Sequence, residues 1–261
     1  MAASLLGQGF MFDGTAAPTM VETGEVAHQL YSQVSFRWHS IYMGIVMVYD
    51  ATDPINRVHC RLVWAHPSEA LTPATAGNAS ASGWRWVDPG GITGADFIPL
   101  NSTVPPGGNA FDSHLCYAAP PVHTPAGERL YYMGSNGPHS GSHPPRNASL
   151  GLAYLRTDGF AGIAGSGTLT TVPLVVGGKT LTLTLDVMRV GGSVAVGAYA
   201  GGSTTPLTGL SLADCAKVSS NVTNGKVIFH AGANFAPQLG QNVTLKLEIT
   251  AAIVYTIGWI D

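Results

Sequence analysis

Residues 180–185 read Thr-Leu-Thr-Leu-Thr-Leu, the strictest alternation of polar and apolar residues in the chain. Successive side chains of a β-strand point to opposite faces of a sheet, so this pattern predicts a strand with one buried face and one face in water. Segments with related alternation lie at 169–174, 193–198, 225–230, 243–250 and 251–257. Together they predict a β-sandwich over residues 165–261, with a domain boundary near Gly165.

Residues 28–164 contain short segments rich in aromatic and β-branched residues, with clusters of turn residues between them. Segments 31–36, 41–49, 58–65 and 84–87 predict one antiparallel four-stranded unit, which is the size of a propeller blade. A second meander is expected over residues 110–160, with its third element at 150–156. The sequence therefore predicts an all-β chain. Residues 1–27 form an N-terminal segment, interpreted as a remnant of an upstream blade.

Composition argues against several classes of protein. Charged residues make up 10% of the chain, which also has 33 Gly and 17 Pro, a balance that favours strands and turns over helices. The net charge of -3 gives no basic stripe for nucleic acid. No apolar run reaches the roughly 18 residues that a membrane helix requires. We expect no cofactor, no nucleic-acid partner and no membrane span.

Five Asn-x-Ser/Thr motifs, which are acceptors for N-glycosylation, indicate a secreted or extracellular protein. They begin at Asn78, Asn101, Asn147, Asn221 and Asn242. Residues 1–15 have a short apolar core and no basic residue before it, which is a poor match to a signal peptide, so we expect further sequence upstream.

The chain has three cysteines, Cys60, Cys116 and Cys215, and they match no zinc spacing. Two interpretations stay open. Either one disulfide forms and leaves one thiol, or all three are buried thiols that act as small apolar groups.

Several short motifs in a shared order resemble one protein family. They are Gln29–Ser32; Trp84–Trp86 before Pro89 and Gly90; Phe111–Ser113 before Cys116 and Tyr117; Tyr131–Gly134 leading through Asn136 and Gly137 to His139; Gly151–Ala153 with Leu155, Arg156 and Asp158–Phe160; and, near the C-terminus, Gly209–Ser211, Asp214, Cys215 and Tyr255. The chain is similar to the invertase-like and arabinanase-like glycosidases with a five-bladed propeller and a C-terminal β-sandwich. The similarity covers nearly all of the chain beyond about residue 28.

This resemblance implies a glycoside hydrolase-like protein that acts on or binds an oligo- or polysaccharide. A five-bladed propeller needs about 200 residues, so residues 28–164 accommodate two to three blades. In the family the catalytic carboxylates lie on early blades, at positions that this chain does not contain. We therefore expect a partner chain or upstream blades to complete the propeller.

Candidate catalytic carboxylates are few, because glycoside hydrolysis needs two carboxyl groups beside the scissile bond. Asp112 stands at the start of the inner strand of the second meander, and its alternative role is to accept backbone N–H groups in a strand-entry turn. Glu25, with Glu22, precedes the strand near residue 31, and its alternative is a solvated loop charge. Three other acidic residues are interpreted as solvated or turn-forming residues rather than catalysts: Asp53, Asp88 and Glu128.

Candidate saccharide-binding residues are Tyr31, Asn136 and His139. Tyr31 begins an inner strand and offers an aromatic face for stacking on a sugar. Asn136 and His139 lie in a Gly/Ser/Pro-rich loop that the resemblance places at the mouth of the propeller, although a mobile loop is the alternative. Trp84 and Trp86 are interpreted as packing between blades. No metal site is expected, because no third ligand accompanies His139 and His143.

Three hypotheses about function remain open. The chain is a glycosidase, a carbohydrate-binding module without catalysis, or an extracellular structural protein. Release of reducing sugar, binding without release, and absence of saccharide binding distinguish them.

Overall fold

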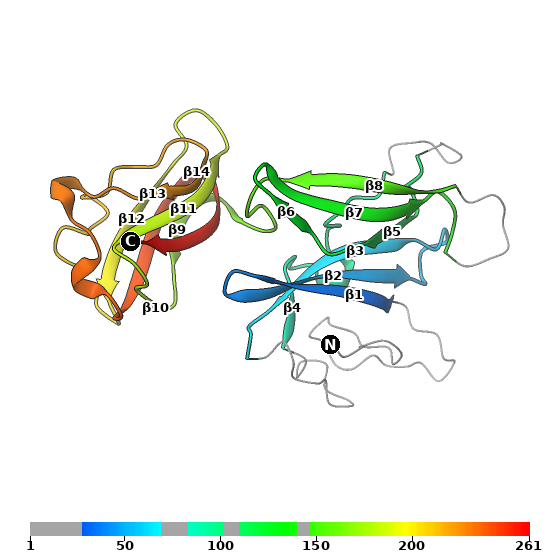
Figure 1. Ribbon diagram of the computed structural model, residues 1–261, viewed down its shortest axis with the longest axis horizontal. Coiled ribbons are helices and arrows are strands. Elements are labelled where there is room, and N and C mark those ends of the chain that lie inside the picture. The colour runs from blue at the N-terminus through cyan, green and yellow to red at the C-terminus, as the bar shows by residue number, and fades with distance from the viewer. Residues whose placement is uncertain (1–27, 69–82, 102–109, 140–146) are drawn as a thin grey trace. The chain divides into compact units, whose positions relative to one another are not determined.

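The computed structural model describes residues 28–68, 83–101, 110–139 and 147–261. Apart from three short 3-10 helices, the regular elements in these ranges are β-strands, which confirms the predicted all-β class (Figure 1). No described helix has the length and apolar character that a membrane crossing requires. The chain divides into two compact units, Met1–Tyr154 and Leu155–Asp261.

The first unit begins with an antiparallel meander. Its strands are β1 (His28–Trp38), β2 (Ile41–Asp50), β3 (Val58–Ala65) and β4 (Trp84–Trp86). Each strand pairs with the next, as the sequence predicts. Trp84 and Trp86 pack against a buried cluster of Val46, Val48, Val63 and Ile92, which belong to their own meander and the 3-10 helix beside it. Ile92 belongs to the 3-10 helix η2 (Gly91–Thr93).

A second group of strands continues the same sheet. It contains β5 (Leu115–Ala118), β6 (Val122–Thr124), β7 (Gly127–Ser135) and β8 (Ala148–Leu155). β7 pairs with β5, β6 and β8, and β5 joins β3 through one parallel bridge, Val58 to Leu115. The sequence predicts β5, β7 and β8 but not β6, whose three residues are too few for a periodic signal.

A disulfide fastens the two groups of strands together. Cys60 of β3 and Cys116 of β5 form the bond, and both residues are buried. This finding selects the first of the two interpretations of the cysteines. Cys215 in the second unit is the remaining free thiol, and burial raises its pKa, which suppresses the reactive thiolate.

The predicted role of Glu128 as a solvated turn residue is wrong. Glu128 lies inside β7, and its side chain is 0% exposed. Its Oε1 lies 2.9 Å from Nδ1 of His123 on β6, while Oε2 has no hydrogen-bond partner. A hairpin turn does precede Glu128, since Thr124 pairs with Gly127, but β7 begins at Gly127 and directs Glu128 inward.

The second unit is built around one long strand, β14 (Asn242–Ile260). The other strands are β9 (Ile163–Thr170), β10 (Leu174–Val175), β11 (Thr180–Val187), β12 (Ser193–Ala200) and β13 (Val222–Lys226), with the 3-10 helices η3 (His230–Gly232) and η4 (Ala236–Gln238). β14 pairs with β12 through residues 243–250 and with β11 through residues 252–260. The predicted pair of strands at 243–250 and 251–257 is therefore one strand. It bends at Ala251, where φ is 41°, instead of turning back.

The predicted wet face of residues 180–185 is also not observed. Leu181, Leu183 and Leu185 are buried as predicted, but Thr182 and Thr184 on the other face are 2% and 0% exposed. Thr184 Oγ1 donates a hydrogen bond to the buried carboxylate of Asp158 and accepts one from the backbone N–H of Asn224. Threonine hydroxyls thus mark a buried polar layer here rather than a solvent face.

Arg156 binds the start of the second unit to the β-sheet of the same unit. Its guanidinium donates to the backbone oxygens of Leu185 and Val222, and it forms an ion pair with Asp186. The same guanidinium lies 4.9 Å from the ring centroid of Tyr255. Burial and the neighbouring Asp186 carboxylate raise the pKa of Tyr255, so this phenol stays protonated and donates to Asp186.

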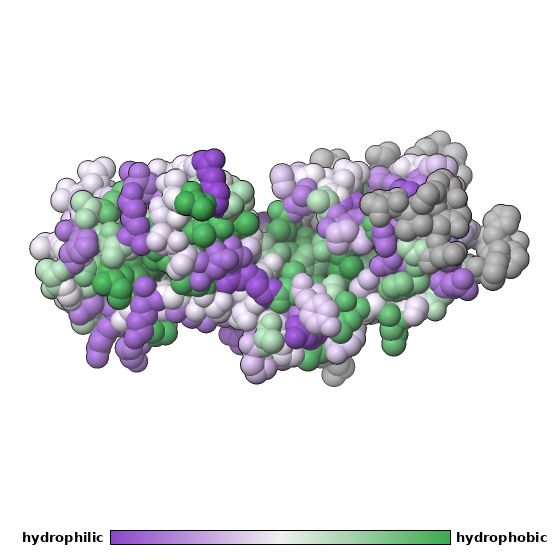
Figure 2. Space-filling view, turned by 90° about the horizontal axis from the view of Figure 1, so that it is seen from above, coloured by the Kyte–Doolittle hydropathy of each residue, from purple (hydrophilic) through white to green (hydrophobic). Residues whose placement is uncertain are grey.

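Apolar side chains reach the surface of both units (Figure 2). On β8 they occupy alternate positions, because Leu150, Leu152 and Tyr154 are 80%, 39% and 63% exposed. Among the described residues β8 pairs with β7 alone, so its second edge carries unpaired backbone groups. Such edges pair readily with other chains.

Removal of the disulfide should destabilise the first unit. The bond closes a loop with a sequence separation of 56 residues. Cys60→Ala combined with Cys116→Ala should lower the free energy of unfolding by about 2–4 kcal/mol, because the unfolded chain gains conformational entropy. Urea unfolding measures this change. Alkylation of the wild-type protein in denaturant without reductant should label Cys215 alone, and labelling of three cysteines would contradict the assignment.

Candidate functional site

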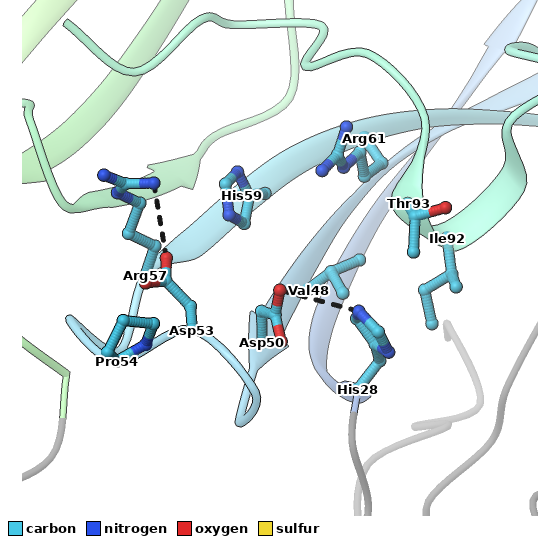
Figure 3. Close-up of a pocket in the computed structure, with 10 residues that line it drawn as sticks. All are labelled: His28, Val48, Asp50, Asp53, Pro54, Arg57, His59, Arg61, Ile92 and Thr93. Carbon is cyan, nitrogen blue, oxygen red and sulfur yellow. Dashed lines mark ion pairs between the residues drawn. The ribbon is translucent and has the colours of Figure 1, made fainter. Parts of the chain in front are cut away.

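A cleft lined by charged residues lies where β1 begins, β2 ends and β3 begins (Figure 3). Its volume is about 330 Å³, within the roughly 300–1,000 Å³ of small-molecule sites. The charged residues that line it are His28, Asp50, Asp53, Arg57, His59 and Arg61, and the apolar ones are Val48, Pro54 and Ile92. We call this site the charged cleft.

The pairing of β2 with β3 places these side chains on one face of the sheet. Val48 lies opposite His59, and Val46 lies opposite Arg61. Side chains of directly paired residues point to the same face, so His59 and Arg61 share the face of Val48. The loop between the strands is closed by a hydrogen bond from the backbone N–H of Asp50 to the oxygen of Arg57.

Acidic and basic groups are matched at the charged cleft. Asp50 Oδ2 lies 3.6 Å from His28 Nε2, and Asp53 Oδ2 lies 3.4 Å from Arg57 Nη1. Asp96, beyond the cleft lining, lies 3.0 Å from His59 Nδ1 and 3.2 Å from Arg61 Nη1. Three carboxylates thus face two guanidinium groups and two imidazoles. With acidic and basic groups in nearly equal number, the site has no large excess of one charge.

The Asp50 carboxylate is held in its ionised form. Burial alone would raise its pKa, but hydrogen bonds from the side chain and backbone of Thr52 and the charge of His28 together lower it below 3.8. Near the same loop, burial and the charge of Arg57 lower the pKa of His114. A carboxylate with a lowered pKa cannot act as the proton donor that glycoside hydrolysis requires.

Asp53 and Asp88 have the turn-forming role predicted for them. Asp53 Oδ1 accepts a hydrogen bond from the backbone N–H of Ile55, and Asp88 Oδ1 accepts one from Gly90. Asp53 therefore shapes the loop beside the charged cleft and also binds Arg57.

The structure brings the predicted binding residues Tyr31 and His139 into contact. His139 also contacts Tyr49 and Tyr117. The His139 ring centroid lies 4.6 Å from that of Tyr31 and 5.3 Å from that of Tyr49, and His139 Nδ1 lies 3.1 Å from the hydroxyl oxygen of Tyr117. Burial, with a smaller contribution from Tyr49, raises the pKa of Tyr31. We call these four residues the aromatic cluster.

The remaining predicted site residues lie elsewhere or have other contacts. Asn136 Oδ1 accepts a hydrogen bond from the backbone N–H of Asn147. Asp112 lies in the turn before β5, and its Oδ2 accepts a hydrogen bond from the hydroxyl of Tyr132 at 2.8 Å. Burial and this carboxylate raise the pKa of Tyr132 to about 12. Glu25 lies outside the described residues, as does Glu22.

Four of the five predicted glycosylation motifs can be located. Asn101, Asn147, Asn221 and Asn242 are exposed, and Asn78 lies outside the described residues. Exposure is necessary for a glycan to be accommodated on the folded protein. Asn221 Oδ1 accepts a hydrogen bond from the backbone N–H of Val187, which still leaves its amide nitrogen available.

Sequence reasoning missed the charged cleft. The available signal was the placement of His59 and Arg61 two residues apart within an otherwise apolar strand, residues 58–65. Two polar residues at that spacing share one face and therefore indicate a polar site against the sheet. Asp96 gives no such signal, because its contact with both residues depends on the fold. Within the described ranges no group of three or more His, Cys, Asp or Glu residues forms a metal site.

No family model matches the chain, and no curated protein matches it.

Replacement of Asp50 tests its electrostatic role. Asp50→Asn should lower the free energy of unfolding at pH 7 by about 1–2 kcal/mol, because the contacts of Thr52 and His28 are made to a charged carboxylate. The folded-state pKa lies below the ordinary value, so this stabilisation is present above the unfolded-state pKa and is lost as the pH falls through the folded-state pKa. Urea unfolding of both proteins from pH 7 to pH 3 should show the difference shrinking below about pH 4. A difference independent of pH would contradict the assignment.

Proposed function

We propose that this chain binds a neutral saccharide in the charged cleft without hydrolysing it. The observation that carries this proposal is that the cleft is lined both by basic side chains, those of Arg57, His59 and Arg61, and by the carboxylates of Asp50 and Asp53. A sugar hydroxyl donates one hydrogen bond and accepts up to two, so one hydroxyl can bridge a guanidinium and a carboxylate.

The charge balance supports a neutral ligand over an ionic one. A strongly anionic ligand would approach Asp50 and Asp53 along with the cations, and a cationic ligand would approach Arg57 and Arg61 along with the carboxylates. Each favourable contact would then be offset by a repulsive one. Hydroxyl groups avoid this penalty, and Val48 and Ile92 offer apolar contact to the C–H groups of a sugar ring.

Binding is favoured over hydrolysis by the state of the carboxylates. Asp50 is held ionised, and the Asp112 carboxylate is occupied by the hydroxyl of Tyr132. The lowered pKa of Asp50 disfavours the protonated carboxyl group that cleavage of a glycosidic bond needs. The resemblance of the sequence motifs to five-bladed glycosidases supports the choice of a saccharide as the ligand class.

We also propose that the two groups of strands in the first unit, which only one parallel bridge joins, are successive propeller blades, that the second unit is a sandwich domain, and that a further chain or upstream blades cover the first unit. The antiparallel meander β1–β4 supports the first part. The exposed Leu150, Leu152 and Tyr154 beside the open edge of β8 support the last part, because a neighbouring sheet would bury them.

Variants of the charged cleft test saccharide binding. A panel of neutral oligosaccharides on an array, followed by calorimetric titration, should reveal a ligand. Arg57→Ala and His28→Ala should each weaken its binding roughly tenfold, as expected for loss of a charge-assisted hydrogen bond. Tyr131→Phe, at an exposed residue outside the cleft, should bind normally. Asp112→Asn should also bind normally.

Release of reducing sugar from the same panel provides the contrasting outcome. No release is expected from the wild-type protein. Release that Asp112→Asn abolishes would instead favour the glycosidase hypothesis, and absence of any saccharide ligand would favour a structural role.

We propose further that the chain passes through the secretory pathway. The disulfide between Cys60 and Cys116 and the exposed acceptors support this proposal, because structural disulfides persist in oxidising compartments. Expression in secretory eukaryotic cells should give a protein whose mass falls on treatment with peptide-N-glycosidase. Peptide mapping should find deamidation, the mark of removed glycans, at Asn101, Asn147 or Asn242. An unchanged mass would contradict glycosylation.

A further inference from the structure

The loop between β2 and β3 connects the charged cleft to the aromatic cluster. Asp53, Pro54 and Arg57 of this loop line the cleft. Asn56, between them, makes its contacts with the cluster: its Oδ1 accepts a hydrogen bond from the Tyr49 hydroxyl at 2.6 Å, and its backbone oxygen accepts one from the backbone N–H of His139 at 3.0 Å. A single residue therefore ties the cleft loop to two other segments.

The backbone conformation of Asn56 determines how the chain continues into Arg57. Its φ is 52°, in the left-handed region that asparagine adopts more readily than most residues. This conformation sets the direction in which the chain enters Arg57. The backbone N–H of Asn56 also donates to the oxygen of Asp53, which closes the turn that carries the ion pair between Asp53 and Arg57.

His139 is itself held in place by the aromatic cluster. Its Nδ1 lies 3.1 Å from the Tyr117 hydroxyl oxygen on β5, and its ring packs against Tyr31 and Tyr49. The contacts thus run from β5 through His139 and Asn56 to Arg57 at the charged cleft. All of these residues belong to the first unit.

We propose that Asn56 is a positioning residue for the charged cleft, and that Tyr49 and His139 act through it to hold Arg57 toward a bound saccharide. This inference rests on the proposed function of the cleft. It gives His139 a different role from the direct saccharide contact that the sequence predicts. The geometry favours positioning, because the backbone N–H of His139 donates to the backbone oxygen of Asn56 and the His139 ring contacts Tyr31 and the Tyr117 hydroxyl. Tyr49 is only 8% exposed, so its ring has little surface left for a ligand.

The test is a double-mutant cycle between the anchor and the cleft. Tyr49→Phe removes only the hydroxyl, and Asn56→Gly removes the side-chain acceptor while tolerating the positive φ. Each should weaken saccharide binding about threefold to tenfold, as expected for loss of one hydrogen bond that orders the site. In the Arg57→Ala background, Tyr49→Phe should produce no further loss. Tyr42→Phe on the same strand is the matched control and should bind normally.

Amide hydrogen exchange of residues 51–57, without ligand, provides a second readout. Tyr49→Phe and Asn56→Gly should accelerate exchange in this loop, whereas Tyr42→Phe should not. This readout would not detect a role confined to direct ligand contact.

The outcomes separate this inference from the proposed function. Equal loss of affinity from Tyr49→Phe with and without Arg57 would overturn it, because Tyr49 would then act independently of Arg57. Unchanged affinity in Tyr49→Phe would also overturn it. If the wild-type protein binds no saccharide, the proposed function fails, and the exchange measurement alone decides: faster exchange in the loop supports positioning, and unchanged exchange rejects it.

Discussion

The antiparallel register of β2 against β3 is the constraint on which the first unit depends. It places Met47 opposite Cys60 on one face of the sheet and Val48 opposite His59 on the other. Because side chains alternate, a shift of one residue in β3 would turn Cys60 toward the cleft face and His59 and Arg61 toward the buried face. The disulfide and the charged cleft are therefore two consequences of one pairing, and neither can form if the other is misplaced.

Local sequence patterns predict strands well where turn residues bound them. Residues 58–65 are predicted with the bounds that the structure has, and the strand predicted from residues 180–185 begins at Thr180 as observed, because Pro and Gly punctuate the chain nearby. The same patterns fail where the environment of a face depends on distant segments. Thr184 alternates like a solvent-facing residue, but Asp158 and Asn224 cover it. Ala251 shows no turn signal, and the bend there continues one strand instead of separating two.

The candidate site was predictable only in part, for the same reason. Tyr31 and His139 were both chosen from the sequence, and they do lie in contact. Tyr31 is predicted from its place at the start of a strand and His139 from the resemblance to glycosidases, and no local rule joins positions so far apart in the chain. The role of Asp96 could not be predicted from the sequence. A β-bridge between Ile98 and Cys60 brings the segment of Asp96 beside β3, where its carboxylate contacts His59 and Arg61. Glu128 shows the opposite error. The turn residues beside it predict an exposed side chain, but Glu128 already belongs to β7 and is buried.

The long strand β14 has a consequence for how the second unit is assembled. β9, β10, β11 and β12 all hydrogen-bond to it, and only β13 among the described strands of that sheet does not. These four strands precede β14 in the chain, so each is synthesised before the strand with which it pairs. The sheet can close only after residues 242–260 have emerged, so its folding is expected to be dominated by contacts distant in sequence. Until then, the alternating Thr-Leu segment at 180–185 has no partner along the edge that β14 will occupy.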